Sequence, residues 1–273
     1  MPELPEVETI KNGLQDFSNY QINQIFQSDK KLRFPSTLQL QKLQNLEILN
    51  FSRRARYLLI NLSQNKTLII HLGMSGKITA NADFKKLKHD HFAISLTNSN
   101  NNIWLIFNDA RRFGFIDLIE SKDLETHKML KNLGPEPLSH EFDFSYLKEK
   151  LKKKAMNIKT AMMDNKIVVG VGNIYINESL FDAKILPTRL ANSLLEIEIK
   201  NLINSIKSII KKAIELGGSS ISDYVKASGD LGNFQNSFKV YGKNGEKCLL
   251  CKKNIQKIVQ NGRSSFFCEA CQK

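Results

Sequence analysis

Apolar residues at the start of the chain recur with the spacing of a helix. Val7, Ile10, Leu14 and Phe17 fall on one face when residues are placed at about 3.6 per turn. Pro5 suits the first helical position, and the acidic residues around it suit the positive end of the helix dipole. The pattern predicts a leading helix that begins at Pro5 and reaches Phe17.

Short β-like runs follow this helix, each bounded by polar or turn-forming residues. The asparagine-rich stretch 98–102 is typical of a hairpin loop between two of them. The expected strands cover residues 57–62, 68–72, 91–96, 103–107 and 113–119. The first half of the chain is therefore predicted to be an antiparallel β-sandwich or barrel.

The Gly-Pro-Glu-Pro sequence at 134–137 interrupts the strand pattern, and we interpret it as a linker. Beyond it the apolar spacing becomes helical, with a stripe between Ile199 and Ile214 that we expect to be core. Ser193 with Glu196 is a candidate capping box for this helix, and Gly217 suits its C-terminal end. The predicted fold class is α+β and multidomain.

Composition adds a partner class to this picture. Apolar residues make up 41% of the chain, and 40 Lys and Arg against 27 Asp and Glu leave a formal net charge of +13. A surface this basic favours a nucleic acid over a surface that is basic only because lysine is abundant. The chain starts with neither the basic segment nor the apolar run of a signal peptide, and it has no lipidation signal. We expect a cytoplasmic protein with no membrane partner.

The four cysteines lie near the C-terminus in two Cys-x-x-Cys pairs, Cys248 with Cys251 and Cys268 with Cys271. Each pair presents two thiolates from one tight turn, and two turns complete a tetrahedron around Zn²⁺. Disulfides or free thiols are the alternative, and an intracellular chain argues against disulfides. We predict one structural Zn²⁺, because protein ligands fill all four positions.

Clusters of cations suit contacts with phosphates. A β-hairpin is expected between the two cysteine pairs, and it carries Lys252, Lys253, Lys257 and Arg263. Arginines are also dense at 53–56 and 111–112, beside expected strands. The lysine run 152–154, taken alone, is interpreted as a solvated face.

Two further motifs have a structural and a functional interpretation. The sequence Gly170-Val171-Gly172-Asn173 lacks the third glycine of a dinucleotide fingerprint. It is interpreted as a tight turn before a helix that begins near Asn173. The backbone N–H groups of this turn can bind a phosphate. His89-Asp90-His91 is interpreted as hydrogen-bonded structure rather than a metal site, with contact to DNA phosphate open for either histidine.

Pro2 becomes a nucleophile candidate if Met1 is removed. An α-amino group has a pKa of about 8 against about 10.4 for lysine, so much more of it is neutral near pH 7. A secondary amine that attacks a sugar C1′ forms an iminium directly, which is an electron sink. Glu3 lies beside it and suits proton donation to an oxygen. A proline at position 2 is ordinarily structural, and only its neighbours favour the catalytic interpretation.

These residues resemble a known family, the bacterial formamidopyrimidine-DNA glycosylases, which are also DNA-(apurinic or apyrimidinic site) lyases. The resemblance covers essentially the whole chain. The matching segments are 2–9, 71–76, 88–91, 111–114, 133–138, 163–166, 169–175 and the four cysteines.

The resemblance implies a fold and a reaction. It implies an N-terminal β-sandwich domain at 1–133, a helix–two-turn–helix domain at 134–236 and a zinc finger at 237–273. It implies excision of oxidised purines, such as 8-oxoguanine and formamidopyrimidines, from double-stranded DNA, followed by β,δ-elimination of the strand. We expect the protein to act as a monomer.

The resemblance also implies roles for residues. Pro2 forms the Schiff base, Glu3 is the general acid at the sugar, and Arg263 assists the last elimination. Three residues are expected to bind DNA phosphates: His89, Lys154 and Asn173. Three others are expected to fill the gap left by the flipped base: Met74, Arg111 and Phe113. Arg111 is expected to face the orphaned cytosine.

This chain departs from the family in two places. Arg56 stands where the family commonly has a lysine assigned to acid catalysis in β-elimination, and arginine does not readily give up a proton. The loop around Gly229-Asp230-Leu231 lacks a lysine that some members have near the damaged base. The first departure leaves Arg56 a phosphate-binding role, and the second bears on lesion preference.

Two alternatives stay open on the sequence. One is an endonuclease VIII-like glycosylase for oxidised pyrimidines, which shares Pro2, Glu3 and the fold; Leu4 and the 111–113 triplet resemble the purine branch more. The other is a non-catalytic zinc-finger DNA-binding protein, against which Pro2 and Glu3 argue.

Overall fold

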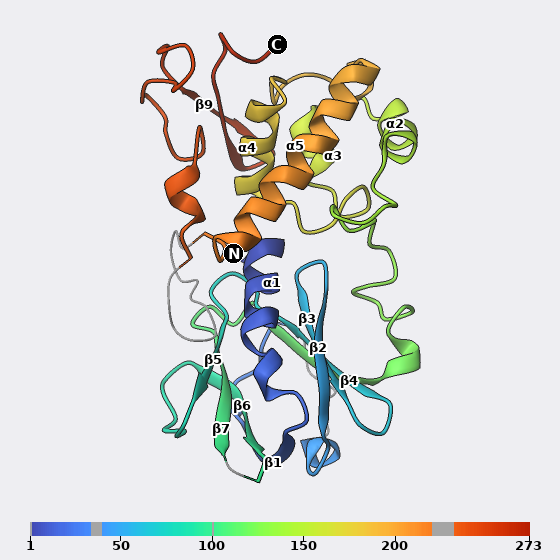
Figure 1. Ribbon diagram of the computed structural model, residues 1–273, viewed down its shortest axis with the longest axis vertical. Helices are drawn as coiled ribbons and strands as arrows, with labels where there is room; N and C mark the ends of the chain where they lie inside the picture. Colours follow the sequence, from blue (N-terminus) through green and yellow to red (C-terminus); the bar gives the residue numbers. More distant parts are fainter. Residues whose placement is uncertain (1, 34–39, 100, 220–231) are drawn as a thin grey trace. The chain divides into compact units, whose positions relative to one another are not determined.

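The structure is a computed structural model that describes residues 2–33, 40–99, 101–219 and 232–273 (Figure 1). The chain divides into two compact units. The first is Met1–Lys131 with Leu216–Gln235, and the second is Asn132–Glu215 with Asn236–Lys273. The second unit therefore contains both the helical segment and the cysteine-rich segment.

The first unit is a β-sandwich with a helix, α1 (Leu4–Gly13), packed on β2 and β3 (Figure 1). One sheet has the strand order β1-β6-β7-β5 and the other β2-β3-β4-β8, with antiparallel neighbours in both. The strands are β1 (Gln21–Gln27), β2 (Ile48–Arg54), β3 (Tyr57–Leu62), β4 (Lys66–His71), β5 (Lys77–Asn81), β6 (Asp90–Thr97), β7 (Asn102–Asn108) and β8 (Phe115–Glu120).

The core of this unit lies between the two sheets. Alternate residues of each strand face inward, as the pleat requires, and aliphatic and phenyl side chains from both sheets fill the space. Ile60 of β3 and Ile94 of β6 are each 1% exposed, and Ile10 of α1 is fully buried in the same cluster. Burial of this apolar surface is the main stabilising contribution to the unit.

The antiparallel sandwich predicted from the sequence is confirmed, and its five expected runs coincide with β3, β4, β6, β7 and β8. Three strands were not predicted. β1 is glutamine-rich and its pairing with β6 is interrupted by an irregularity between Ile22 and Ile25. β2 mixes polar and apolar residues without clean alternation, and β5 alternates over only five residues, which is a short signal.

The leading helix is shorter than predicted. It begins at Leu4, so Pro5 takes the second helical position rather than the first, and it ends at Gly13. A 3-10 turn then carries Phe17, which nevertheless packs against the core. The apolar spacing continues past Gly13 because the α-helix and the 3-10 turn that follows it turn their apolar residues toward the same core.

The second unit contains four helices and a β-hairpin among its described residues. Helices α4 and α5 pack together, and α4 also packs on the hairpin. The elements are α2 (Phe144–Lys152), α3 (Ile158–Met162), α4 (Asn173–Asp182), α5 (Glu196–Glu215), β9 (Gln256–Gln260) and β10 (Arg263–Phe267). Short 3-10 turns in the described chain are Gln15–Phe17, Leu40–Leu43, Ser121–Asp123, Ala191–Ser193 and Phe234–Ser237.

Helix α5 confirms the predicted stripe but not the predicted cap. Its inward residues are buried, and Gly217 follows it with a φ of 77°, as a left-handed C′ residue requires. Ser193 lies in a separate 3-10 turn, where its hydroxyl donates to the carbonyl of Leu190. The carboxylate of Glu198 instead accepts the N–H of Leu195. The capping box was wrong because Leu194 and Leu195 lie between the turn and the helix.

The Gly-Pro-Glu-Pro segment lies just after the division between the units at Lys131 and Asn132. It is fixed within the second unit: Gly134 N–H donates to Asn165 O, and Val169 N–H donates to Pro135 O. None of the described helices is both long and apolar enough to cross a membrane.

Candidate active site and nucleic-acid interface

Residues 2 and 3 are buried at the beginning of α1. Pro2 is buried, and Glu3 is only 5% exposed. The N–H of Glu3 donates to Glu6 Oε2 at 2.8 Å, which satisfies one of the donors that a helix start leaves unpaired. The backbone beside the candidate nucleophile is therefore held by a carboxylate one turn along the helix.

The same carboxylate binds a segment more than two hundred residues away. Both the N–H and the hydroxyl of Ser219 donate to Glu6 Oε1, at 2.8 and 3.1 Å. Gly218 lies against Glu6 with a φ of 76°, and a Cβ there would meet Glu6 Cγ at 3.0 Å. A side chain at 218 would be strained by both the backbone conformation and the close approach. Glu6 thus links the start of α1 to the segment that follows α5.

Helix α1 is also joined to the turn between β2 and β3. Glu8 accepts hydrogen bonds from Arg53 Nε and Lys11 Nζ, each at 2.6 Å. Burial alone would raise the pKa of Glu8, but the hydrogen bonds and the positive charges of Lys11 and Arg53 together outweigh it and lower the pKa. Arg53 Nη1 also donates to Ala55 O in the turn. Arg56 therefore lies in a turn that is fixed to α1, at the end of the unit where the helix begins (Figure 1).

His71, at the end of β4, is a neutral histidine beside this turn. Its Nδ1 accepts the N–H of Gly73 at 3.1 Å, and its ring lies 4.9 Å from that of Tyr57. Burial, together with the positive charge of Arg56, lowers its pKa to about 4, although the Asp109 carboxylate opposes this. The sequence carried no signal for His71 alone, because its protonation state depends on neighbours from three segments.

The three residues expected in the gap lie on two loops that touch. Gly73 has a φ of 62°, and a Cβ there would lie 2.4 Å from the carbonyl carbon of Phe113. The structure thus brings the loop of Met74 against the loop of Arg111 and Phe113. Met74 is half-buried, Arg111 is exposed, and the Arg111 guanidinium lies 4.9 Å from the Phe113 ring centroid. Arg33, which the sequence did not single out, lies 5.6 Å from the same ring.

Asp90 and His91 of the His89-Asp90-His91 motif are hydrogen-bonded to neighbouring segments, as interpreted. Asp90 is buried and accepts from the N–H of Leu87 and from Asn108 Nδ2. The ring of His91 is hydrogen-bonded to Ser28 Oγ and to the carbonyl of Asp109. His89 is half-buried at the beginning of β6, which leaves part of its surface open to solvent.

In the second unit, Asn173 and the hairpin turn that carries Arg263 are brought together. Asn173 begins α4, and its Nδ2 donates to the carbonyl of Ser264 at 3.1 Å. Lys159 is 1% exposed and donates to the same carbonyl and to Ser265 Oγ, each at 2.8 Å. Arg263 itself is exposed. The predicted helix start near Asn173 is confirmed, whereas Lys159 was not predicted.

Asn173 Oδ1 is buried and has no hydrogen-bond partner among the described residues. A buried polar atom without a partner is rare in folded proteins, and at a binding site a ligand or water can supply the partner. Asn173 Oδ1 can therefore accept a further hydrogen bond while Nδ2 donates to Ser264.

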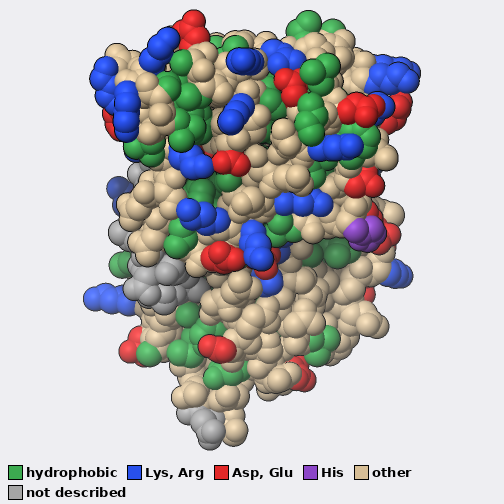
Figure 2. Space-filling view, turned by 45° about the horizontal axis from the view of Figure 1, so that its top comes forward, with side chains coloured by type: hydrophobic (Ala, Val, Ile, Leu, Met, Phe, Trp, Pro, Cys, Tyr) green, Lys and Arg blue, Asp and Glu red, His purple; other side chains and the backbone are tan. Residues whose placement is uncertain are grey.

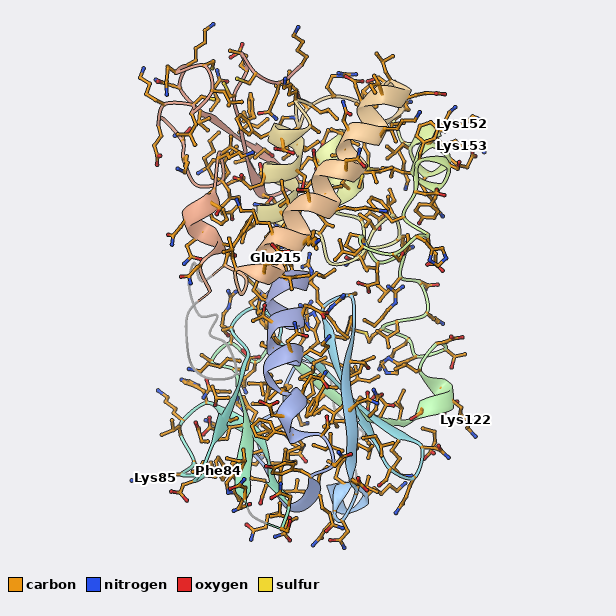
Figure 3. All side chains as sticks on the ribbon, viewed as in Figure 1. Phe84, Lys85, Lys122, Lys152, Lys153 and Glu215 are labelled. Carbon is orange, nitrogen blue, oxygen red and sulfur yellow. The ribbon has the colours of Figure 1, made fainter. Side chains whose placement is uncertain are left out.

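The three lysines 152–154 differ in their surroundings. Lys152 and Lys153 are exposed at the end of α2 and point away from the helix (Figure 3). Lys154 is half-buried, with its Nζ 3.8 Å from Asp164 Oδ2. A surface ion pair of this length is weak, so Lys154 is not held to one partner.

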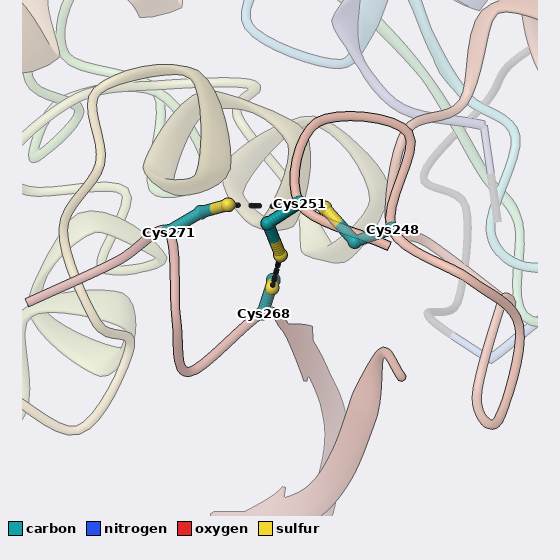
Figure 4. A group of neighbouring side chains, drawn as sticks. All are labelled: Cys248, Cys251, Cys268 and Cys271. Carbon is teal, nitrogen blue, oxygen red and sulfur yellow. Dashed lines mark hydrogen bonds between the residues drawn. The ribbon is translucent and has the colours of Figure 1, made fainter. Parts of the chain in front are cut away.

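The four cysteines converge as the spacing predicts (Figure 4). Their sulfur atoms all lie within 4.8 Å of one another, with Sγ–Sγ distances of 3.4 Å for Cys251 and Cys268 and 3.9 Å for Cys248 and Cys271. A tetrahedron with Zn–S bonds of about 2.3 Å places its sulfurs about 3.8 Å apart. The N–H of Lys253 contributes most to lowering the pKa of Cys251 to about 7, whereas burial raises the pKa of Cys268 and that of Cys271, so the fit to Zn²⁺ rests on the sulfur geometry. The four thiol groups therefore fit Zn²⁺.

Basic side chains are dispersed over the face of the molecule that Figure 2 shows. Figure 2 shows lysine and arginine groups interspersed with acidic ones over the face in view. On this face, charge alone does not mark where a nucleic acid binds, and the assignment depends on individual residues. The loop around Gly229-Asp230-Leu231 lies outside the described residues.

Comparison with family models covers most of the chain. Residues 1–116 match the formamidopyrimidine-DNA glycosylase N-terminal domain, 133–225 match the formamidopyrimidine-DNA glycosylase H2TH domain, and 245–273 match the zinc finger found in FPG and IleRS. These matches and the sulfur geometry confirm the predicted zinc finger, which holds a structural Zn²⁺.

Known proteins are similar over the full length. The chain is 47% identical over 275 residues to the formamidopyrimidine-DNA glycosylase of Wolbachia pipientis wMel, covering 100% of both chains. It is 44% identical over 276 residues to that of Rickettsia bellii, again covering 100% of both. Among solved structures, a complex of Lactococcus lactis Fpg with DNA containing an abasic site has a TM-score of 0.89 at 38% identity, with 99% of each chain covered. MutM (FPG) from Thermus thermophilus has a TM-score of 0.88 at 34% identity, covering 99% of this chain and 98% of that one.

Proposed function

Because this chain belongs to the formamidopyrimidine-DNA glycosylase family, we propose that it is a bifunctional base-excision repair enzyme. It removes oxidised purines, such as 8-oxoguanine and formamidopyrimidines, from double-stranded DNA and then cleaves the strand at the resulting site. The observation that carries the proposal is the beginning of α1, where Pro2 and Glu3 are buried beside a carboxylate that fixes their backbone.

The reaction begins at the amine of Pro2 once Met1 is removed. The neutral nitrogen attacks C1′, so an N–C1′ bond forms and the glycosidic bond breaks, with its electron pair leaving on the base. The proton of the attached nitrogen passes to the departing base. Glu3 donates a proton to the ring oxygen of the sugar, which opens the ring and yields an iminium. The positive nitrogen acidifies the C2′ protons. Loss of one of them expels the 3′ phosphate, and a second elimination expels the 5′ phosphate.

The remaining site residues hold the DNA. His89, Lys154, Asn173 and Arg263 bind phosphates, and Arg263 assists the second elimination. Met74, Arg111 and Phe113 enter the duplex where the damaged base has left the stack, which offsets part of the few kcal/mol that unstacking costs. The exposure of Arg111 and Phe113, on a loop that touches the loop of Met74, supports this role. The protein acts as a monomer, with the functional domains 1–133, 134–236 and 237–273.

Arg56 and the zinc ion have supporting roles. Because arginine does not readily give up a proton, Arg56 binds phosphate and does not act as an acid in β-elimination. The four cysteines would hold Zn²⁺, which stabilises the small hairpin and has no open position for a substrate. The hairpin in turn carries Arg263.

The proline mechanism is tested by borohydride reduction on duplex DNA containing 8-oxoguanine opposite cytosine. Only an iminium is reduced to a stable amine, so the protein becomes covalently attached to DNA. Protein that begins at Pro2, verified by intact mass, is expected to be trapped. Protein with a tag before Pro2 is the control and is expected not to be trapped. Pro2→Gly is a poorer control because it retains an α-amine.

If the tagged protein is trapped and cuts as fast as the free form, the nucleophile is a lysine and the proposal fails. A panel of duplexes with oxidised purines and oxidised pyrimidines then ranks the substrates. This panel bears on the endonuclease VIII-like alternative, since Lactococcus lactis Fpg has been crystallised with DNA containing an oxidised pyrimidine.

A further inference from the structure

Asp109 is a fully buried carboxylate that no part of the proposed reaction uses. It lies directly after β7 and is 0% exposed. Its Oδ1 accepts the hydroxyl of Ser75 at 2.6 Å and the N–H of Arg111 at 3.2 Å. Its Oδ2 accepts the N–H of Gly114 at 2.7 Å. One side chain therefore binds the beginning and the end of the loop 111–114 and also a residue of the neighbouring loop.

Ser75 completes the connection between these loops. Its side chain is buried, donates to Asp109 and accepts the N–H of Arg111 at 3.1 Å. The backbone of Asp109 extends the network, since its N–H donates to the carbonyl of His89 and its carbonyl accepts the N–H of Arg112. Ser75 and Asp109 thus connect the loops of Met74, Arg111 and His89.

These buried contacts support residues that have little packing of their own. Arg111 is exposed, Phe113 is 36% exposed, and Arg112 between them has a φ of 56°, which non-glycine residues rarely adopt. A backbone in this region persists when surrounding structure determines it. The hydrogen bonds to Asp109 and Ser75 on either side of Arg112 provide that constraint.

We propose that Ser75 and Asp109 form a positioning pair that sets the spacing of Met74, Arg111 and Phe113, and through them the recognition of the base opposite the lesion. This rests on the proposed function of those three residues. The pair itself does not touch DNA. It determines specificity because a displacement of the Arg111 backbone moves the guanidinium relative to the orphaned base.

The proposal separates two activities of the protein. Excision from a duplex needs the gap to be filled and the opposite base to be contacted, so it depends on the positioned loops. Schiff-base formation by Pro2 at an abasic sugar in a single strand has no opposite base and no gap. Loss of the pair therefore impairs the first activity and spares the second.

The test compares Ser75→Ala with Ser95→Ala. Ser95 on β6 is 1% exposed and donates to Asn102 Oδ1 at 2.7 Å, so its replacement is the same chemical change in the same unit, outside the two loops. Loss of the two hydrogen bonds of Ser75 should lower kcat/KM on duplex 8-oxoguanine opposite cytosine about tenfold. The preference for cytosine over adenine opposite the lesion should fall with it. Borohydride trapping on a single-stranded abasic oligonucleotide should stay within about twofold of wild type.

Asp109→Asn is the second variant, because its amide nitrogen cannot accept the hydrogen bonds that the carboxylate does. It should show the same split between duplex excision and single-strand trapping. Unchanged opposite-base preference in both variants would overturn the proposal. Equal losses on both substrates, or an equal loss in Ser95→Ala, would also overturn it, since the effect would then be general to the fold. Failure of the wild type to be trapped on the single strand would instead contradict the proline mechanism.

Discussion

Acidification should destabilise the first unit through His71. The ring is neutral in the folded state because burial and the nearby Arg56 charge lower its pKa from an ordinary 6.5 to about 4. Above about pH 7 the ring is neutral in both folded and unfolded chains, and the full stability is present. As the pH falls from 6.5 towards 4, the unfolded chain binds a proton that the folded chain does not. The free energy of unfolding therefore decreases with decreasing pH.

The size of the effect follows from the difference between the two pKa values. Each pKa unit corresponds to about 1.4 kcal/mol, so the whole effect is about 3 kcal/mol, and about 2 kcal/mol of it is lost between pH 7.5 and pH 5. His91 adds to the same trend, since burial is the largest cause of its lowered pKa. The contribution of His71 is isolated by replacing it with a residue that does not titrate.

His71→Asn is the suitable replacement, because the amide oxygen of asparagine can accept the N–H of Gly73 as Nδ1 does. Urea unfolding followed by tryptophan fluorescence reports on the correct unit, since the single tryptophan of the chain is Trp104 on β7. The variant should lose about 2 kcal/mol less than wild type on going from pH 7.5 to pH 5. His140→Asn changes an exposed histidine of the second unit and should leave the wild-type difference unchanged.

An equal loss of stability in wild type and His71→Asn would refute this reasoning. It would mean that His71 is protonated in the folded protein at pH 5, and hence that the ring is not shielded from water as its burial indicates. An increase in wild-type stability on acidification would contradict the sign of the effect.

Three further predictions concern the metal, the phosphates and the acid. Metal analysis should find one Zn²⁺ per chain, and Cys268→Ser should lose it. Chelation should weaken DNA binding before the sandwich unfolds. Full DNA affinity of the metal-free protein would show that the zinc hairpin does not contribute to binding. A log–log plot of DNA affinity against salt concentration should be linear and steep. Arg263→Ala should reduce its slope by about one unit if the variant loses one phosphate contact. An unchanged slope would show that Arg263 does not contact a phosphate. Glu3→Gln should bind lesion duplex but excise the base at least about 100-fold more slowly, because an amide cannot donate the carboxylic proton; wild-type excision rates would exclude Glu3 as the acid.

Local features of the sequence were enough to predict the parts of the protein that depend on near neighbours. The two Cys-x-x-Cys pairs predicted a zinc site, because each turn fixes two ligands regardless of the rest of the fold. Gly217 predicted the end of α5, since the left-handed conformation there is a requirement of the backbone alone. The long β-branched and aromatic runs predicted five strands for the same reason, as their preference is expressed along the chain.

The tertiary structure decided what depends on distant partners. Strand β1 was not predicted because its glutamine-rich sequence is a strand only when paired with β6. Glu6 looked like an ordinary acidic residue at a helix start, and its role emerges from hydrogen bonds to Ser219, 213 residues later. The neutral state of His71 requires burial together with the charge of Arg56 from another hairpin. Asp109 has no sequence signal, because its function as an acceptor for Ser75 and Gly114 exists only where two loops meet in a site that excludes water.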